Sequence, residues 1–254
     1  MLRVLIFSCA VIALLYLGAC AVLYAFQGSL IYYPQPRSVG TATTVLKLPV
    51  ADADVLVSVW PHSGPDALLY FGGNAEDVSR NLPVFSQAFP DRALYLLHYR
   101  GYGSSSGEPS EEAIQRDAIA LFDKVHADHP RIAVIGRSLG SGVAVRLASQ
   151  RPASSLILIT PYNSFEEIAA DQFPHMPVKW LLRDKFESWR YAPRIAVPTR
   201  LIAASQDEVI PRASTERLYT HFAKGVASLE VIPGVGHNTI SAGPQYLEAI
   251  RAGL

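Results

Sequence analysis

Two hydrophobic patterns divide the chain beyond its first forty residues. In segments 43–50 and 55–61 apolar and polar positions alternate, as in an antiparallel pair of strands at the edge of a sheet. The later runs are continuously apolar, which is typical of strands buried on both faces. These six runs cover residues 67–73, 92–99, 131–137, 155–162, 199–205 and 228–233.

Segments with helical character lie between the later runs. Residues 110–129 place Ile114, Leu121 and Phe122 on one helical face, and acidic residues occupy the first turn. Residues 211–225 begin with proline and end with glycine, as helices often do, and residues 243–254 close the chain. The alternation predicts a mostly parallel, eight-stranded sheet with helices on both faces, and chemistry at the C-terminal ends of its strands.

Residues 163–196 interrupt this alternation. The segment is rich in Phe, Trp, Met and Pro. It is long for a connection within a compact domain, so we expect a small lid rather than a loop.

The N-terminus is strongly apolar from Val4 to Phe26, and no charged residue interrupts this run. A bilayer core requires about 20 apolar residues in a helix, and the core of a cleaved secretory signal is shorter, at roughly 7–15 residues. The pattern therefore predicts a membrane anchor over residues 1–27 and a globular domain over residues 28–254. The sequence LGAC at 17–20 resembles a lipoprotein cleavage box, so processing at Cys20 remains an alternative.

The cations that flank the apolar run indicate an orientation. Arg3 precedes the run, and Arg37 is the nearest cation after it. The positive-inside rule then favours a cytoplasmic N-terminus, with the globular domain on the extracytoplasmic or periplasmic side.

Composition narrows the function classes. Half of the 254 residues are hydrophobic, which excludes a disordered chain, and 22 basic residues balance 22 acidic ones, which gives no electrostatic case for nucleic acid. Cys9 and Cys20, the two cysteines, both lie in the apolar N-terminus, so we expect neither a disulfide framework nor a cysteine zinc site in the globular part. The sequence also lacks a P-loop, a dinucleotide fingerprint and a His-Glu-x-x-His motif, so no cofactor or metal is expected. The oligomeric state stays open.

One serine carries the most specific chemical pattern. Ser138 lies in the sequence GRSLG, between Gly136 and Gly140, where an apolar run meets a helix-like segment. A sharp turn from strand to helix exposes such a serine, and side chains two residues away on either side would collide. The serine oxygen would then lie at the positive end of the helix, where negative charge is stabilised. We therefore expect Ser138 to be a nucleophile.

A serine nucleophile needs a base, and the base needs an orienting carboxylate. In this architecture both follow the serine, in the order acid and then histidine. His237 lies in a glycine-flanked loop after the last apolar run and is the expected base, whereas His175 lies in the lid and His221 within a helical segment.

The acid is expected just beyond the run 199–205. Asp207 occupies that place, and we expect the adjacent Glu208 to point elsewhere. A role for Asp207 in capping a turn is the structural alternative.

An oxyanion requires two backbone donors. The amide that follows the nucleophile, Leu139, is one, and the loop after the third strand should supply the other. That loop reads YFGGNAED, and we assign the backbone amide of Asn74, the alternative being an ordinary Gly-Gly turn.

Taken together, the motifs resemble the α/β-hydrolase superfamily, and its membrane-anchored single-domain branch in particular. That branch includes acyl-protein thioesterases and lysophospholipase-like enzymes. The matching segments keep the family order and span most of the chain: LIYYP, FGGN, YRGYGSSSGEPSE, IGRSLGSGVA, PVKWLLRDKF, QDEVIP and GVGHN. The resemblance implies an α/β-hydrolase fold with Ser138, Asp207 and His237 as catalytic triad. Where the family usually has His-Gly-Asn, this chain has Gly72, Gly73 and Asn74.

These features favour a membrane-anchored serine hydrolase that cleaves carboxylic esters or thioesters of acyl or lipid-like substrates. A serine peptidase on the same triad is one alternative. A catalytically silent, membrane-tethered binding protein is another, because a fold does not by itself fix a function.

Overall fold

The computed structural model describes residues 1–38 and 44–254 and contains one eight-stranded sheet, in the order β1-β2-β4-β3-β5-β6-β7-β8. Strand β2 is antiparallel to its neighbours β1 and β4, and the remaining pairs are parallel. All eight predicted strands are present, although Thr43, the first residue of the predicted run 43–50, lies outside the described residues. The bounds are β1 (Thr44–Val50), β2 (Ala53–Trp60), β3 (Asp66–Phe71), β4 (Ala93–Leu97), β5 (Arg131–Arg137), β6 (Ser155–Ile159), β7 (Thr199–Ala204) and β8 (Ala227–Ile232).

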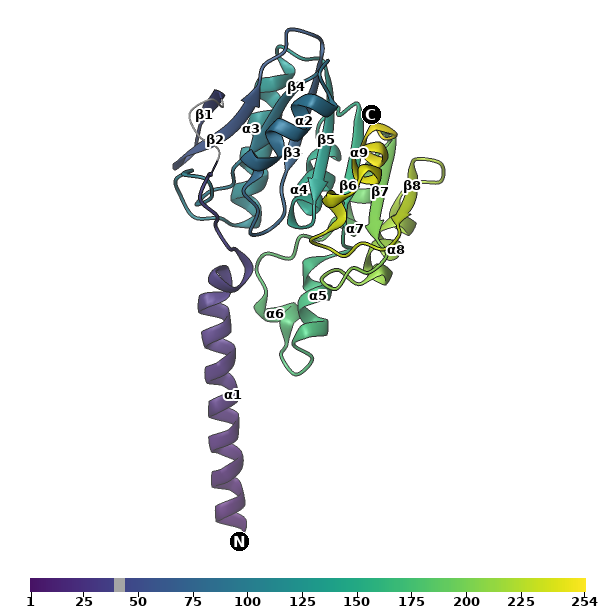
Figure 1. Cartoon of the computed structure of the whole chain (residues 1–254). Helices are drawn as coiled ribbons and strands as arrows, with labels where there is room; N and C mark the ends of the chain where they lie inside the picture. Colours follow the sequence, from purple (N-terminus) through teal and green to yellow (C-terminus); the bar gives the residue numbers. More distant parts are fainter. Residues whose placement is uncertain (39–43) are drawn as a thin grey trace.

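Helices cover both faces of the sheet, as expected (Figure 1). One face packs against α3 (Glu111–His126), α4 (Leu139–Ala148) and α8 (Arg212–His221). The other packs against α2 (Leu82–Ala88), which follows a short 3₁₀ turn at Val78–Asn81, and α9 (Pro244–Arg251), which follows one at Ile240–Ala242. Side chains alternate between the two faces along each strand: in β3, Leu69 and Phe71 belong to the first core, and Leu68 and Tyr70 to the second.

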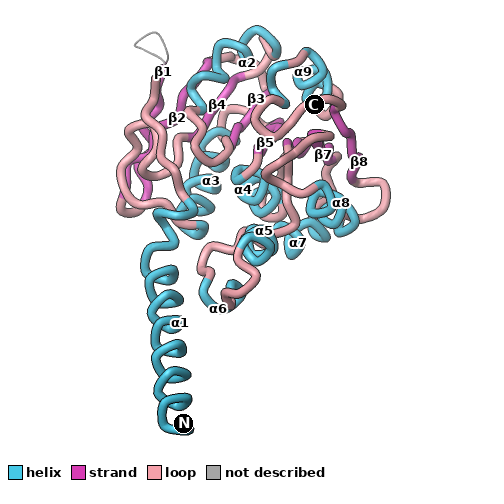
Figure 2. Tube along the Cα trace, turned by 60° about the horizontal axis from the view of Figure 1, so that its bottom comes forward, coloured by secondary structure: helices cyan, strands magenta, loops and turns pink. Residues whose placement is uncertain are grey.

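Residues 163–196, the segment that we call the lid, form three short helices and a 3₁₀ turn. These are α5 (Phe165–Gln172), α6 (Val178–Leu181), α7 (Ser188–Tyr191) and Ala192–Arg194. Glu111, at the start of α3, accepts hydrogen bonds from the backbone N–H groups of Lys185 and Phe186 and so fixes the stretch between α6 and α7. Helices α5 and α6 lie at the end of the molecule from which α1 emerges (Figure 1, Figure 2).

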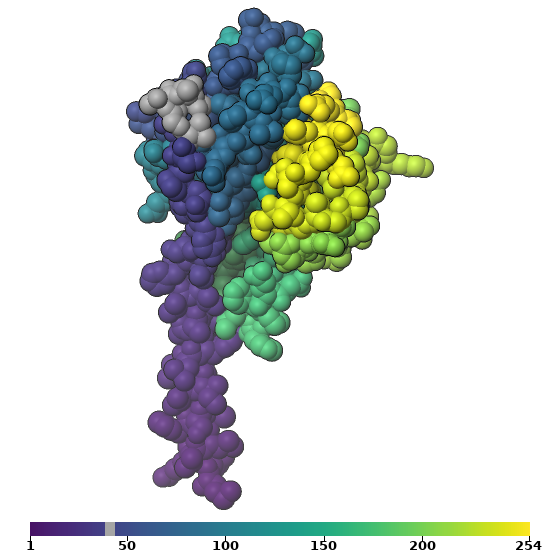
Figure 3. Space-filling model, viewed as in Figure 1, coloured from purple at the N-terminus to yellow at the C-terminus, as the bar shows by residue number. Residues whose placement is uncertain are grey.

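Helix α1 (Leu2–Ile31) extends away from the globular part. It is long and apolar enough to cross a membrane. The helix continues four residues beyond the expected anchor boundary at residue 27, and the chain is then fixed by Tyr32, which is buried and donates a hydrogen bond to Asp184 in the lid at 2.8 Å. In the space-filling view the lid lies against the side of the helix (Figure 3).

His98 is a titratable group enclosed by the edge of the sheet. It follows β4, is 2% exposed, and its Nε2 lies 2.9 Å from Ser58 Oγ. The imidazole fills the space beside Gly103, where a Cβ atom would collide with the ring. Burial, together with the charge of Arg37, lowers the pKa of His98 from 6.5 to about 4, against the opposing effect of Asp77.

We predict that this histidine makes the fold less stable in acid. The unfolded chain binds the His98 proton near pH 6.5, whereas the folded protein binds it only near pH 4, so stability is lost as the pH falls through that window. The loss from this group is about 3 kcal/mol. Denaturant unfolding of the full chain in detergent between pH 4 and 7 should therefore show a weaker pH dependence for His98→Gln than for wild type.

The matched control for this measurement is the exposed His175, for which His175→Gln should retain the wild-type slope. Identical slopes for His98→Gln and wild type would contradict the assignment.

Candidate active site

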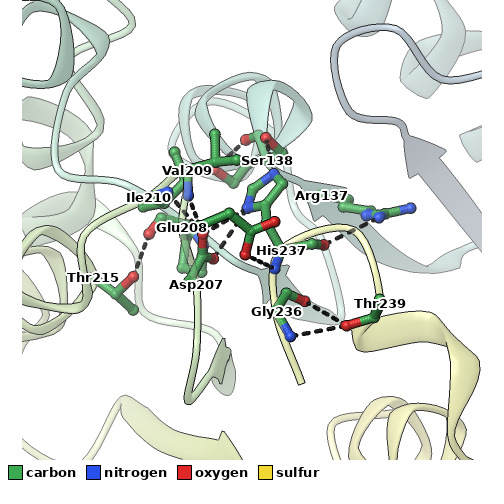
Figure 4. A network of polar contacts seen from close by, with 12 residues as sticks. Arg137, Ser138, Asp207, Glu208, Val209, Ile210, Thr215, Gly236, His237 and Thr239 are labelled. Carbon is green, nitrogen blue, oxygen red and sulfur yellow. Dashed lines mark hydrogen bonds and ion pairs between the residues drawn. The ribbon is translucent and has the colours of Figure 1, made fainter. Parts of the chain in front are cut away.

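Three side chains from three strand ends meet at one edge of the sheet (Figure 4). Ser138 follows β5, Asp207 lies beyond β7, and His237 lies beyond β8. His237 Nε2 is 2.9 Å from Ser138 Oγ, and Nδ1 is 3.0 Å from both carboxylate oxygens of Asp207. The parallel strands bring these positions together because their C-terminal ends share one edge of the sheet.

Ser138 lies at a strained turn between β5 and α4. Its φ of 49° and ψ of −118° are unusual for a residue with a side chain. A Cβ atom on Gly140 would collide with the carbonyl of Phe71 in β3, and one on Gly136 would collide with the carbonyl of Gly140. The two glycines therefore let the helix start directly against the strands, as the sequence pattern predicted.

The hydrogen bonds around His237 fix its tautomer. An ionised carboxylate can only accept, so the contact with Asp207 requires the proton on Nδ1. Nε2 is then free to accept the hydroxyl proton of Ser138. Both the imidazole and the Asp207 carboxylate are largely shielded from water, with 8% and 5% of their side chains exposed.

Asp207 also caps its own turn. Its Oδ1 accepts the N–H groups of Val209 at 2.9 Å and Ile210 at 2.7 Å. Asp207 therefore both caps this turn and contacts His237, because one carboxylate has enough acceptor sites for both roles.

Glu208, which we expect to point away from the acid position, turns its side chain to the backbone of the histidine loop. Its Oε2 accepts the N–H of His237 at 3.1 Å, and the carboxylate fills the space beside Gly236. From the other side, Arg137 Nη2 donates to the His237 carbonyl at 3.3 Å. The loop is therefore held at both polar groups of the His237 backbone.

Glu76 organises the loop that follows β3. It accepts the N–H of Gly73 at 2.6 Å and the hydroxyl of Tyr70 at 2.7 Å, and its carboxylate lies 3.7 Å from Arg137. The loop passes close to the serine, since a Cβ atom on Gly73 would lie 3.5 Å from Ser138 Cβ. No sequence motif marks Glu76, although its position three residues after Gly73 suits such a turn.

Asn74 has a second role in its side chain. Its Oδ1 accepts the Tyr33 N–H at 3.0 Å and the Tyr102 hydroxyl at 2.7 Å, and its Nδ2 donates to the carbonyl of Ile31 at 2.5 Å. These bonds fix the end of α1 beside the site. Within residues 1–38 and 44–254, the backbone N–H groups of Asn74 and Leu139 donate to no protein acceptor.

A pocket of about 270 Å³ opens over Ser138 and His237. Its wall is polar on the side of Asn74, Glu76 and Arg137. The two remaining candidate histidines lie elsewhere: His175 is exposed in the lid, and His221 lies beside Trp189 at the end of α8.

Comparison with known proteins connects this arrangement to a family. Residues 69–191 match the sequence model of the hydrolase family described as serine aminopeptidase, S33. An uncharacterized protein of Mycobacterium tuberculosis is 36% identical to this chain over 264 residues. The match covers 95% of this chain and 92% of the mycobacterial protein.

Two further similarities are more distant. The α/β-hydrolase domain-containing protein WAV2 of Arabidopsis thaliana is 26% identical, over 80% of this chain and 78% of its own. Among solved structures, an esterase of Pyrococcus furiosus superposes with a TM-score of 0.67 at 17% identity, covering 87% of this chain and 95% of that one. The last similarity concerns the fold alone.

We predict that Gly140→Ala destabilises the protein by about 1–3 kcal/mol, because the added methyl group meets the Phe71 carbonyl at a backbone that cannot move independently. Gly28→Ala is the matched control, since a Cβ at this position in helix α1 has no neighbour within 4 Å. It should not destabilise the protein, because alanine favours a helix more than glycine does. Equal unfolding midpoints for the two variants in denaturant would contradict the close packing at the turn.

Proposed function

The chain belongs to the α/β-hydrolase superfamily, and on that premise we propose that it is a membrane-anchored serine hydrolase acting on carboxylic esters or thioesters of acyl or lipid-like substrates. The observation that carries the proposal is the continuous hydrogen-bonded path from Asp207 through His237 to Ser138. Such a path gives a serine hydroxyl the base that it otherwise lacks at neutral pH.

In the proposed reaction Ser138 Oγ attacks the substrate carbonyl while His237 Nε2 takes the hydroxyl proton. The imidazolium then gives that proton to the leaving alcohol or thiol, and an acyl-enzyme remains. A water molecule, deprotonated by the same nitrogen, attacks the acyl-enzyme, and the proton returns to Ser138 as the acid is released. Asp207 keeps Nδ1 protonated and stabilises the charged ring during both steps.

We propose the backbone N–H groups of Leu139 and Asn74 as donors to the oxyanion. Leu139 is the first residue of α4, so its N–H points along the positive end of the helix dipole. Asn74 belongs to the loop that Glu76 holds close to Ser138. Fixed donors of this kind stabilise the charge that develops in the transition state.

We further propose that α1 is retained as a single-pass anchor, with the domain on the extracytoplasmic side. Three contacts support retention: Gln27 donates to the Leu181 carbonyl and accepts the Arg183 N–H, and Tyr16 donates to the His175 carbonyl. The orientation rests on Arg3 and the positive-inside rule.

The description of the matching family favours a second candidate, a serine peptidase on the same triad. Chromogenic 4-nitrophenyl esters compared with aminoacyl 4-nitroanilides separate the two. We expect the esters to have the higher kcat/KM, and a preference for the anilides would favour the peptidase.

We predict that a fluorophosphonate probe labels the full-length protein in detergent at Ser138 alone. Phosphonylation requires a serine activated by its histidine, so Ser138→Ala should not label and His237→Ala should label far more slowly. Ser86→Ala, on the exposed side of α2, is the control and should label fully. Undiminished labelling of Ser138→Ala would place the reactive group elsewhere, and no labelling of wild type would favour a silent binding protein.

The substitution Asp207→Asn tests the proposed catalytic role of the Asp207 carboxylate separately from its role in capping the turn. The asparagine Oδ1 can still accept from Val209 and Ile210, so the unfolding midpoint should change little. Asn Oδ1 would still lie close to His237 Nδ1, but the neutral amide cannot stabilise the imidazolium, and its NH₂ group, at the place of Oδ2, can donate to Nδ1 and favour the wrong tautomer. We therefore expect kcat on an ester to fall by about 10³–10⁴-fold. A kcat within tenfold of wild type would contradict the role of Asp207.

A further inference from the structure

A second cavity, of about 230 Å³, lies between α1 and the lid. Helix α1 contributes one wall, and α5 and α6 contribute the other. The lining is mostly apolar and includes Leu23, Leu30, Ile31, Phe165, Ala169 and Phe173. A pocket with this lining favours an apolar ligand over a polar one, because a buried polar group without a partner is costly.

Gln27 lines the same cavity, but its polar groups are already used. Its Nε2 donates to the carbonyls of Tyr24 and Leu181, and its Oε1 accepts the Arg183 N–H. The side chain is buried and joins α1 to the lid. It therefore fixes the width of the cavity without adding a free polar group to it.

The cavity lies beside the part of α1 that is suited to a bilayer. The tip of the lid is bound to α1 through the hydrogen bond from the Tyr16 hydroxyl to the His175 carbonyl, at 3.0 Å. Tyr16 precedes Ile31 by fifteen residues, or about 22 Å at the helical rise, and belongs to the apolar run that ends at Phe26. When α1 spans a membrane, the tip of the lid thus reaches into the near leaflet.

Large apolar side chains of the lid are exposed near that tip. Phe173 is 47% exposed and Trp180 is 85% exposed. In water this exposure is unfavourable, whereas aromatic side chains are enriched where a protein meets lipid. Their exposure supports contact between the lid and the bilayer.

The apolar cavity adjoins the pocket of the serine. Tyr33 lines the cavity, Asn74 lines the serine pocket, and the Tyr33 N–H donates to Asn74 Oδ1. The wall of the serine pocket beyond Asn74 is polar, with Glu76 and Arg137. The two parts of an ester match these two surfaces, because an acyl ester has an apolar chain on one side of the carbonyl and a polar leaving group on the other.

We propose that the cavity between α1 and the lid binds the acyl chain of a substrate that enters directly from the bilayer. Helix α1 is then a wall of the substrate site as well as an anchor. This inference rests on the proposed hydrolase function and names its substrate class, a long-chain acyl ester or thioester held in the membrane.

The test compares two substitutions in α5 of the full-length protein, reconstituted in phosphatidylcholine vesicles. Ala169→Phe fills the cavity, whereas Ala170→Phe adds the same side chain at the neighbouring exposed position. The readout is the ratio of kcat/KM for 4-nitrophenyl palmitate to that for 4-nitrophenyl butyrate. We expect Ala169→Phe to lower this ratio at least about tenfold, the factor that roughly two buried methylene groups contribute, and Ala170→Phe to keep the wild-type ratio.

A second readout does not depend on hydrolysis. A diazirine-bearing fatty acid in the same vesicles should crosslink to residues 165–182 of Ser138→Ala, measured relative to its crosslinking to residues 4–16 of α1. Adding Ala169→Phe should reduce that relative yield, and adding Ala170→Phe should not.

The outcomes separate the two proposals. An unchanged palmitate-to-butyrate ratio in Ala169→Phe, or a relative crosslinking yield that it does not reduce, would overturn the acyl-chain site even if butyrate is hydrolysed normally. Crosslinking that depends on Ala169, together with a protein with Ser138 intact that hydrolyses neither ester, would support the acyl-chain site and contradict the hydrolase function.

Discussion

The hydrogen bond between His237 and Ser138 is the interaction on which the rest of the structure depends. It joins the ends of β5 and β8, which are separated in the sheet by β6 and β7. Nε2 can accept a hydrogen bond from Ser138 only because Asp207 keeps the ring proton on Nδ1. The sheet positions the three residues, and the contacts of Glu208 and Arg137 with the His237 backbone keep the loop from moving away.

The turn at Ser138 imposes a second constraint. A serine in strained dihedral angles persists only where the surrounding packing leaves no alternative. Here the close approach of Gly140 to the Phe71 carbonyl supplies that packing and brings β3, with the loop that follows it, beside the serine. This packing contact therefore helps to set both the exposure of Ser138 and the position of the two proposed oxyanion donors.

Much of this arrangement could be predicted from local patterns. Continuous apolar runs identified the strands because burial on both faces leaves a signature within a few residues, and Gly136 and Gly140 identified the turn because the steric demand is local. The roles of Glu76 and Glu208 could not be predicted in this way. Each role depends on which backbone N–H group lies nearby in the folded chain. Because every residue type except proline has such an N–H group, the identity of the donor residue gives no sequence signal. The Asn74 side chain is a similar case, since its partners Ile31, Tyr33 and Tyr102 are distant along the chain.

Hydrogen bonds connect helix α1 both to the lid and to the edge of the sheet that carries Ser138. Asn74 joins the end of α1 to the serine pocket, and Gln27 and Tyr16 join α1 to the lid. The most direct test of the central claim, that His237 activates Ser138 for acyl transfer, is rapid-quench mass spectrometry of the full-length protein with a 4-nitrophenyl ester. We expect an acyl adduct on the peptide containing Ser138, formed at the rate of the nitrophenol burst. Ester turnover with no adduct on that peptide, or with the adduct on another residue, would contradict the claim.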